Sequence, residues 1–83
     1  MDIRITVGKN LRRVRLERGL SQETLAAEAG IAPSFLSQIE NGKRSATVTT
    51  LDVLAKALKT PIVEFFTVPF TVSRGLPRGR RMR

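Results

Sequence analysis

Apolar residues recur every three or four positions in five successive stretches of the chain, as on one face of an α-helix. In chain order they are Val7, Leu11 and Val14; Leu25, Ala26 and Ala29; Ala32, Leu36 and Ile39; Leu51, Leu54, Ala55 and Leu58; and Ile62, Phe65 and Phe66. Short polar links separate these stretches. The pattern predicts an all-α fold class, namely a compact domain of five short helices.

Capping and turn residues indicate where these helices begin and end. Ser21 and Thr49 are typical N-caps for the second and fourth helices. Pro33 suits the first turn of the third helix, which is expected over residues 32–41. The first three helices are each followed by a glycine, at Gly19, Gly30 and Gly42.

The start of the first helix has two interpretations. Asp2 is a typical N-cap for a helix that includes Ile3 and Val7. Ile3, Ile5 and Val7 also alternate with polar residues, as they would in a short β-strand. The pattern alone leaves both open.

After the fifth helix the apolar period changes from helical to alternating. The alternating apolar residues are Phe66, Val68, Phe70 and Val72. They predict a short β-strand over residues 66–72, which Pro69 confines to the edge of a sheet. The expected organisation is therefore a helical domain, residues 1–66, and a C-terminal extension, residues 67–83.

The third helix has an unusual polar face. Ser34, Ser37, Gln38 and Asn41 lie opposite its apolar residues, and none of them is the Lys or Glu that solvated helix faces usually carry. Short neutral side chains that both donate and accept hydrogen bonds suit contact with the edges of DNA bases.

The spacing that follows Gln22 predicts two helices crossing steeply over a tight turn. Ala26 is small where the next helix passes close, and Gly30 can adopt the left-handed conformation of the turn. Leu36 and Ile39 anchor the second of these helices on the core, which forces its polar face outward. This is a helix-turn-helix arrangement, whose outward face enters the major groove of DNA.

Two runs of the sequence resemble the phage-repressor-like helix-turn-helix family, also called the XRE family: LSQETLAAEAGIAPSFLSQIENGKR and LDVLAKAL. The resemblance covers residues 7–66, and in size it is nearest to restriction–modification controller proteins and small phage repressors. It implies a lambda-repressor-like fold and a regulator of transcription that binds double-stranded DNA. It further implies a homodimer that inserts helix 32–41 into the major groove of an operator with two half-sites.

By the same resemblance, the side chains that contact bases are those of Ser34, Phe35, Ser37 and Gln38. Glutamine bonds adenine bidentately, and serine can donate to or accept from several bases. Phe35 has two open interpretations, because it either packs on a thymine methyl or sugar, or is buried beside Leu36 and Ile39.

The resemblance assigns phosphate contacts to Gln22, Asn41, Lys43 and Arg44, which fix the register of the protein on DNA. It also pairs Arg15 with Glu40, which would hold the recognition helix from behind. The alternative is that these two residues are independent surface charges.

Charge supports a polyanionic partner. The chain carries 15 Lys and Arg against 7 Asp and Glu, a formal net charge of +8. Five of the basic residues are arginines within residues 74–83, where no acidic residue occurs. Nucleic acid is the first candidate for such a partner, and the alternative is a charged tail that only keeps the protein soluble.

Several function classes are disfavoured by composition. The sequence has no Cys and no His, which removes the usual metal ligands, the thiol nucleophile and the usual general base. We therefore expect neither an enzyme nor a metal or cofactor site, and no small-molecule effector is evident. No apolar run is long enough for a membrane span, so a cytoplasmic protein without membrane contact is expected.

Three roles for the C-terminal segment remain open. In the first, residues 66–72 form an added strand that pairs with its copy in a second chain or with residues 3–7. A dimer interface would then involve Ile62, Phe65, Phe66, Val68 and Phe70. In the second, the phenylalanines only cover the end of the core, and in the third, the arginines run along DNA. Two alternative functions are an antitoxin-type autorepressor, which also binds a partner protein through this segment, and an RNA-binding protein. The scarcity of aromatic residues disfavours RNA.

Overall fold

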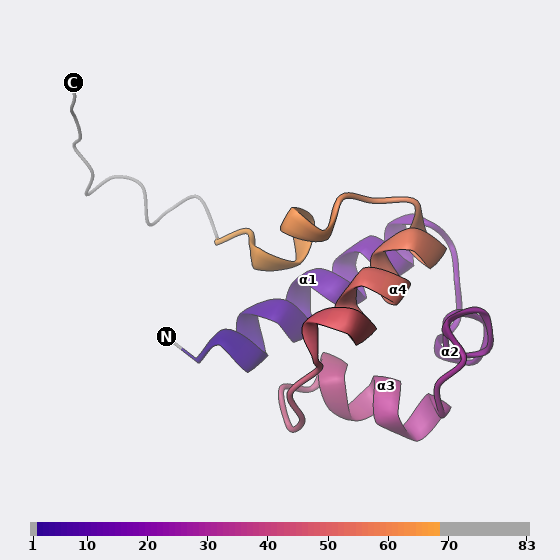
Figure 1. Ribbon diagram of the computed structural model, residues 1–83, viewed down its shortest axis with the longest axis horizontal. Coiled ribbons are helices and arrows are strands. Elements are labelled where there is room, and N and C mark those ends of the chain that lie inside the picture. The colour runs from indigo at the N-terminus through magenta and orange to yellow at the C-terminus, as the bar shows by residue number, and fades with distance from the viewer. Residues whose placement is uncertain (1, 69–83) are drawn as a thin grey trace.

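The computed structural model describes residues 2–68, and the regular elements of this part of the chain are all helices, without a β-strand. Its elements are α1 (Ile3–Glu17), α2 (Gln22–Ala29), α3 (Pro33–Glu40), α4 (Val48–Leu58) and the 3-10 helix η1 (Ile62–Phe66). Figure 1 shows α1 and α4 between η1 above and α3 below, with α2 at one end. The predicted all-α fold class is confirmed.

One hydrophobic core joins all five elements. Its buried members are Val7, Leu11, Val14, Leu25, Ala26, Leu36, Ile39, Leu51, Leu54, Ala55, Leu58 and Phe65. All twelve belong to the apolar stripes that the spacing predicts, because each helix can bury only one stripe of its surface. No helix in residues 2–68 has the length and apolar character that crossing a membrane requires.

The helix ends confirm most of the predicted boundaries and correct one. The Asp2 carboxylate accepts a hydrogen bond from the Arg4 backbone N–H at 3.0 Å, so the chain begins as a capped helix and not as a strand. Hydrogen bonds from Arg4 also hold the pKa of the Asp2 carboxyl below its ordinary value. The fourth helix is capped by Thr47, whose hydroxyl accepts from the Thr50 N–H at 3.0 Å, and not by Thr49 as predicted.

The C-terminal predictions are corrected where the structure reaches them. The fifth helix is a 3-10 helix and not an α-helix, and Phe66 is its last residue. Residues 67 and 68, which belong to the predicted strand over residues 66–72, are in neither a helix nor a strand. The rest of the predicted strand and the arginines of residues 74–83 lie outside the described residues.

A close approach at Gly8 fixes α1 against the end of α3. A Cβ atom placed on Gly8 would lie 2.4 Å from the Ile39 carbonyl oxygen and 2.7 Å from that of Glu40. Both neighbours are backbone atoms, so they cannot move aside as a flexible side chain can. Gly8 therefore allows the backbones of α1 and α3 to come closer than any other residue would permit.

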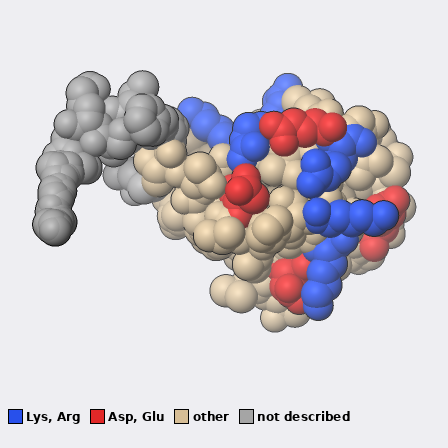
Figure 2. All heavy atoms as spheres, turned by 90° about the horizontal axis from the view of Figure 1, so that it is seen from above, with Lys and Arg blue, Asp and Glu red and all other residues tan. Residues whose placement is uncertain are grey.

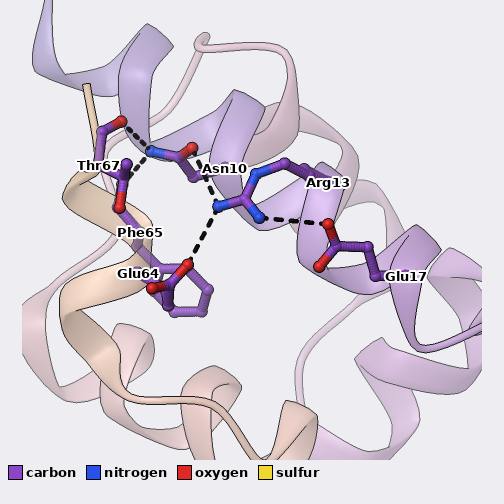
Figure 3. Close-up of polar contacts among 6 residues, drawn as sticks. All are labelled: Asn10, Arg13, Glu17, Glu64, Phe65 and Thr67. Carbon is purple, nitrogen blue, oxygen red and sulfur yellow. Dashed lines mark hydrogen bonds and ion pairs between the residues drawn. The ribbon is translucent and has the colours of Figure 1, made fainter. Parts of the chain in front are cut away.

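Polar side chains of α1 hold η1 and the residue after it (Figure 3). The Asn10 Nδ2 amide donates to the carbonyl oxygens of Phe65 at 3.0 Å and Thr67 at 2.7 Å. Beside it, the Arg13 guanidinium contacts Glu17 and Glu64, each at 3.3 Å. We call Asn10, Arg13 and Glu64 the α1–η1 clamp; it fastens the end of the described chain to the middle of α1.

We predict that Gly8→Ala lowers stability by about 1–3 kcal/mol, because the added methyl group overpacks the contact with the carbonyls of Ile39 and Glu40. Alanine in an exposed helix normally has the opposite effect. Thermal unfolding followed by circular dichroism measures the change. Lys9→Ala, at the exposed neighbouring position, is the control and should stay within about 0.5 kcal/mol of the wild type. An unchanged or raised melting temperature for Gly8→Ala would contradict the packing.

Candidate nucleic-acid interface

A tight turn joins α2 to α3 and sets the angle between them. Gly30 has φ +71°, the left-handed conformation that glycine adopts without a Cβ clash. The Ile31 N–H then donates to the Ala26 carbonyl at 3.0 Å, which closes the turn. Ala26, Leu36 and Ile39 are buried, so the same side of both helices faces the core.

The opposite face of α3 points away from the core. Ser34 and Gln38 are exposed, and Ser37 is half-buried. Asn41, the C-cap residue, is exposed, and its Nδ2 amide lies 3.4 Å from the Ser37 hydroxyl. These side chains form the polar face of α3, which carries no formal charge. The helix α3 itself lies along the lower edge of the molecule in Figure 1.

Basic side chains lie beside the polar face of α3. Lys43 and Arg44 are exposed in the loop that follows α3. The Arg44 guanidinium lies over the ring of Phe35, with 5.3 Å between its central carbon and the ring centroid. Arg4 lines the same groove as Arg44, a space of about 240 Å³ between the start of α1, the α3–α4 loop and Phe66.

A buried ion pair holds α3 from behind. The Arg15 Nε and Nη2 atoms donate to the two carboxylate oxygens of Glu40 at 2.7 and 3.0 Å. The side chains are 8% and 1% exposed, respectively. Two further hydrogen bonds complete the site: Arg15 Nη1 donates to the Leu20 carbonyl at 2.8 Å, and Gln22 Nε2 donates to Glu40 at 3.0 Å.

This network stabilises the charged form of the Arg15 guanidinium. Hydrogen bonding to Glu40 raises the pKa of the Arg15 guanidinium above its ordinary value. The residues joined come from α1, from the α1–α2 link and from the ends of α2 and α3. One polar cluster therefore connects every element that sets the position of α3.

Charges elsewhere are mixed. Figure 2 shows the molecule from the side opposite to α3, where basic and acidic side chains lie interspersed. In residues 2–68 no three acidic side chains gather as a metal site would need, and the sequence supplies no His or Cys. The polar face of α3 differs from that surface, because it has neutral side chains at its centre and cations beside it.

The family model described as "HTH_3: Helix-turn-helix" matches residues 11–65, more than half of the chain. The chain belongs to this helix-turn-helix family. The resemblance to XRE-family proteins is thus confirmed, and the matched residues include all of α2, α3 and α4.

Named relatives of this helix-turn-helix protein are regulators. It is 46% identical over 67 residues to the uncharacterized HTH-type transcriptional regulator y4dJ of Sinorhizobium fredii, covering 81% of this chain and 87% of that protein. It is 37% identical over 67 residues to the control protein C.SmaI of Serratia marcescens, covering 81% and 80%. Among solved structures, the restriction-modification controller protein C.AhdI of Aeromonas hydrophila has a TM-score of 0.74 at 36% identity, covering 76% of this chain and 96% of that one.

Most of the residues predicted to contact DNA lie on α3 or directly after it. One residue predicted for the dimer interface lies elsewhere, in the core. Phe65, proposed for a dimer interface, is 0% exposed and belongs to the core of a single helix-turn-helix domain. Phe66 and Val68 are exposed, Ile62 is half-buried, and Phe70 lies outside the described residues.

Two residues that shape the surroundings of α3 are not among those predicted from the sequence. Gly8, which sets the distance from α1 to α3, has one signal in the sequence: a glycine in the middle of a predicted helix costs stability and so suggests a packing reason. Arg4 has no such signal, because only the folded chain brings it to the groove beside Arg44.

We predict that Arg15→Ala lowers the free energy of unfolding by about 3–5 kcal/mol, because Glu40 would remain buried without its cation. Thermal or urea denaturation measures this change. Arg13→Ala is the matched control: its ion pairs are exposed, so the expected loss is below about 1 kcal/mol.

A double variant separates the buried charge from lost packing. Arg15→Met with Glu40→Leu removes both charges together, and it should be less destabilised than Arg15→Ala alone. If Arg15→Ala unfolds at the same temperature as the wild type, the pair does not stabilise α3.

Proposed function

We propose that this protein is a sequence-specific DNA-binding regulator of transcription that inserts α3 into the major groove. The single observation that carries this proposal is the polar face of α3, uncharged and directed outward, with Lys43 and Arg44 beside it. The family and the named regulators among its relatives support the same function.

Base contacts are proposed for the polar face of α3. Gln38 is exposed and can bond the N6 and N7 atoms of adenine with its amide. Ser34 is exposed one turn earlier, and its hydroxyl can donate to or accept from several bases. Ser37 is half-buried and lies 3.4 Å from the Asn41 amide, so Asn41 helps to orient its hydroxyl.

Phosphate contacts are proposed on both sides of α3. Lys43 and Arg44 supply charge in the loop after it, and Asn41 supplies an amide at its end. On the other side, Gln22 begins α2, where the first N–H groups of the helix have no partner within the helix. Its amide gives one N–H to Glu40, and the second N–H is available to a phosphate oxygen.

A homodimer is proposed because one recognition helix contacts few base pairs. Exposed apolar side chains at the end of the described chain support an interface: Val63 is 64% exposed, Phe66 40% and Val68 41%. Two copies related by a two-fold axis would place two α3 helices in successive major grooves, about 34 Å apart. Phe65 takes no part, because it packs within one chain.

Selection of binding sites from random duplexes tests this function. The expected result is a palindromic site whose half-site centres lie about 10 base pairs apart. Enrichment of a single half-site would contradict the dimer but not the DNA-binding function. No enrichment over a random pool would contradict sequence-specific binding altogether.

We predict that Gln38→Ala reduces affinity for the selected site by about fivefold to 150-fold, because a bidentate base contact contributes about 1–3 kcal/mol of discrimination. Affinity for a random duplex should hardly change. Fluorescence anisotropy at fixed salt measures both affinities. Lys43→Ala is the contrasting variant, since loss of a phosphate contact should weaken binding to both duplexes alike. Equal effects of Gln38→Ala on both duplexes would contradict its role.

We predict that deletion of residues 74–83 flattens the salt dependence of DNA binding more than it alters sequence preference. The five arginines in this range can each displace a counterion, and each phosphate contact contributes about 0.9 to the slope of log affinity against log salt. Affinity measured across a salt series gives the slope. A slope equal to that of the full chain would show that the arginines do not contact DNA.

A further inference from the structure

The stack between Phe35 and Arg44 joins the recognition helix to the loop that follows it. Phe35 lies in the first half of α3, and Arg44 lies beyond its end, with 5.3 Å between the guanidinium carbon and the ring centroid. The turn at Gly42, with φ +74°, directs the chain away from the helix between them. The two residues meet only because the loop folds back along α3.

The ring of Phe35 is already largely occupied. Phe35 is half-buried and packs against the hydrophobic core on its inner side. Arg44 lies over a face of the same ring, as expected for a cation–π contact. A ring held between the core and a guanidinium has little apolar surface left for a base.

The charge of Arg44, in contrast, remains available. The ion pairs formed within residues 2–68 use the cations Arg4, Arg13, Arg15 and Lys56, and Arg44 is in none of them. A guanidinium that lies over the face of a ring still has N–H groups that can donate to a phosphate. Stacking also restricts a long side chain that would otherwise lose rotamer freedom on binding.

We propose that Phe35 is a positioning residue and not a base contact: it stacks under Arg44 and holds that guanidinium beside α3, ready for a DNA phosphate. This inference rests on the DNA-binding function proposed above. It couples the helix that contacts bases to the loop that contacts the backbone. Phe35 therefore contributes to affinity for every DNA sequence and carries no information about bases.

A double-mutant cycle tests the coupling. Phe35→Leu keeps an apolar side chain but removes the ring, and it should weaken binding about two- to fivefold on the selected site and on a random duplex alike. In an Arg44→Gln background the same change should have little further effect, because the stacked charge is already absent. In a Lys43→Gln background, the matched control, the two losses should multiply.

Two further measurements separate positioning from a structural effect. Phe35→Tyr keeps the ring and should retain wild-type affinity. In the free protein, proton NMR should show the Arg44 side-chain resonances shifted by the ring current, and Phe35→Leu should remove that shift. Binding is compared well below the melting temperature of each variant, so that all of them are folded.

Several results would overturn the proposal. If Phe35→Leu alters which bases are preferred, or if its effect multiplies with that of Arg44→Gln, Phe35 acts independently of Arg44. The absence of a ring-current shift would show that the stack does not form in solution. Failure of the proposed function is distinct: the wild-type protein would then show no preference for any duplex, whatever the NMR spectrum of Arg44.

Discussion

The buried ion pair between Arg15 and Glu40 is the interaction on which the position of α3 depends. Burying two charges carries a large desolvation cost, and it is offset only when the geometry is good and the remaining donors and acceptors are bonded. The Arg15–Glu40 pair is bidentate, and Leu20 and Gln22 add one hydrogen bond to Arg15 and to Glu40, respectively. We infer that the pair serves mainly to select one arrangement of α1, α2 and α3, since an apolar replacement could be equally stable.

The contact at Gly8 acts on the same end of α3 by a different means. Its neighbours are the carbonyls of Ile39 and Glu40, and Glu40 is also the acceptor of the ion pair. Close packing thus sets how near α1 lies, while directional bonds set how α3 is rotated. Since the inner side and the end of α3 are both held, its outward face needs no contacts within the protein to keep its orientation.

The sequence predicts the α-helices and most of the core, because helical spacing directly indicates which residues share a face. It is less informative about anything that depends on the folded neighbours. Thr47 and Thr49 are equally good caps by type, and only the fold selects Thr47. Phe65 shares the apolar stripe of η1, but spacing cannot tell whether the same chain or a partner covers that stripe. The pairing of Arg15 with Glu40 follows from the family resemblance alone. No pattern in the sequence predicts the Gly8 contact or the α1–η1 clamp, because each joins residues that are far apart along the chain.

The α1–η1 clamp has a consequence for everything that follows it in the chain. Asn10 holds the Thr67 carbonyl at 2.7 Å, which makes Thr67 an anchored point on the surface of the domain. The groove shared by Arg4 and Arg44 is lined by Phe66, the residue before it. A segment tethered there meets the adjoining surface at an effective concentration set by the length of the tether and not by the amount of protein. The DNA contacts proposed for the arginines of residues 74–83 would then add to those of the helical domain on the same duplex. Even if each were weak, they would contribute far more to affinity than the same arginines in a separate peptide.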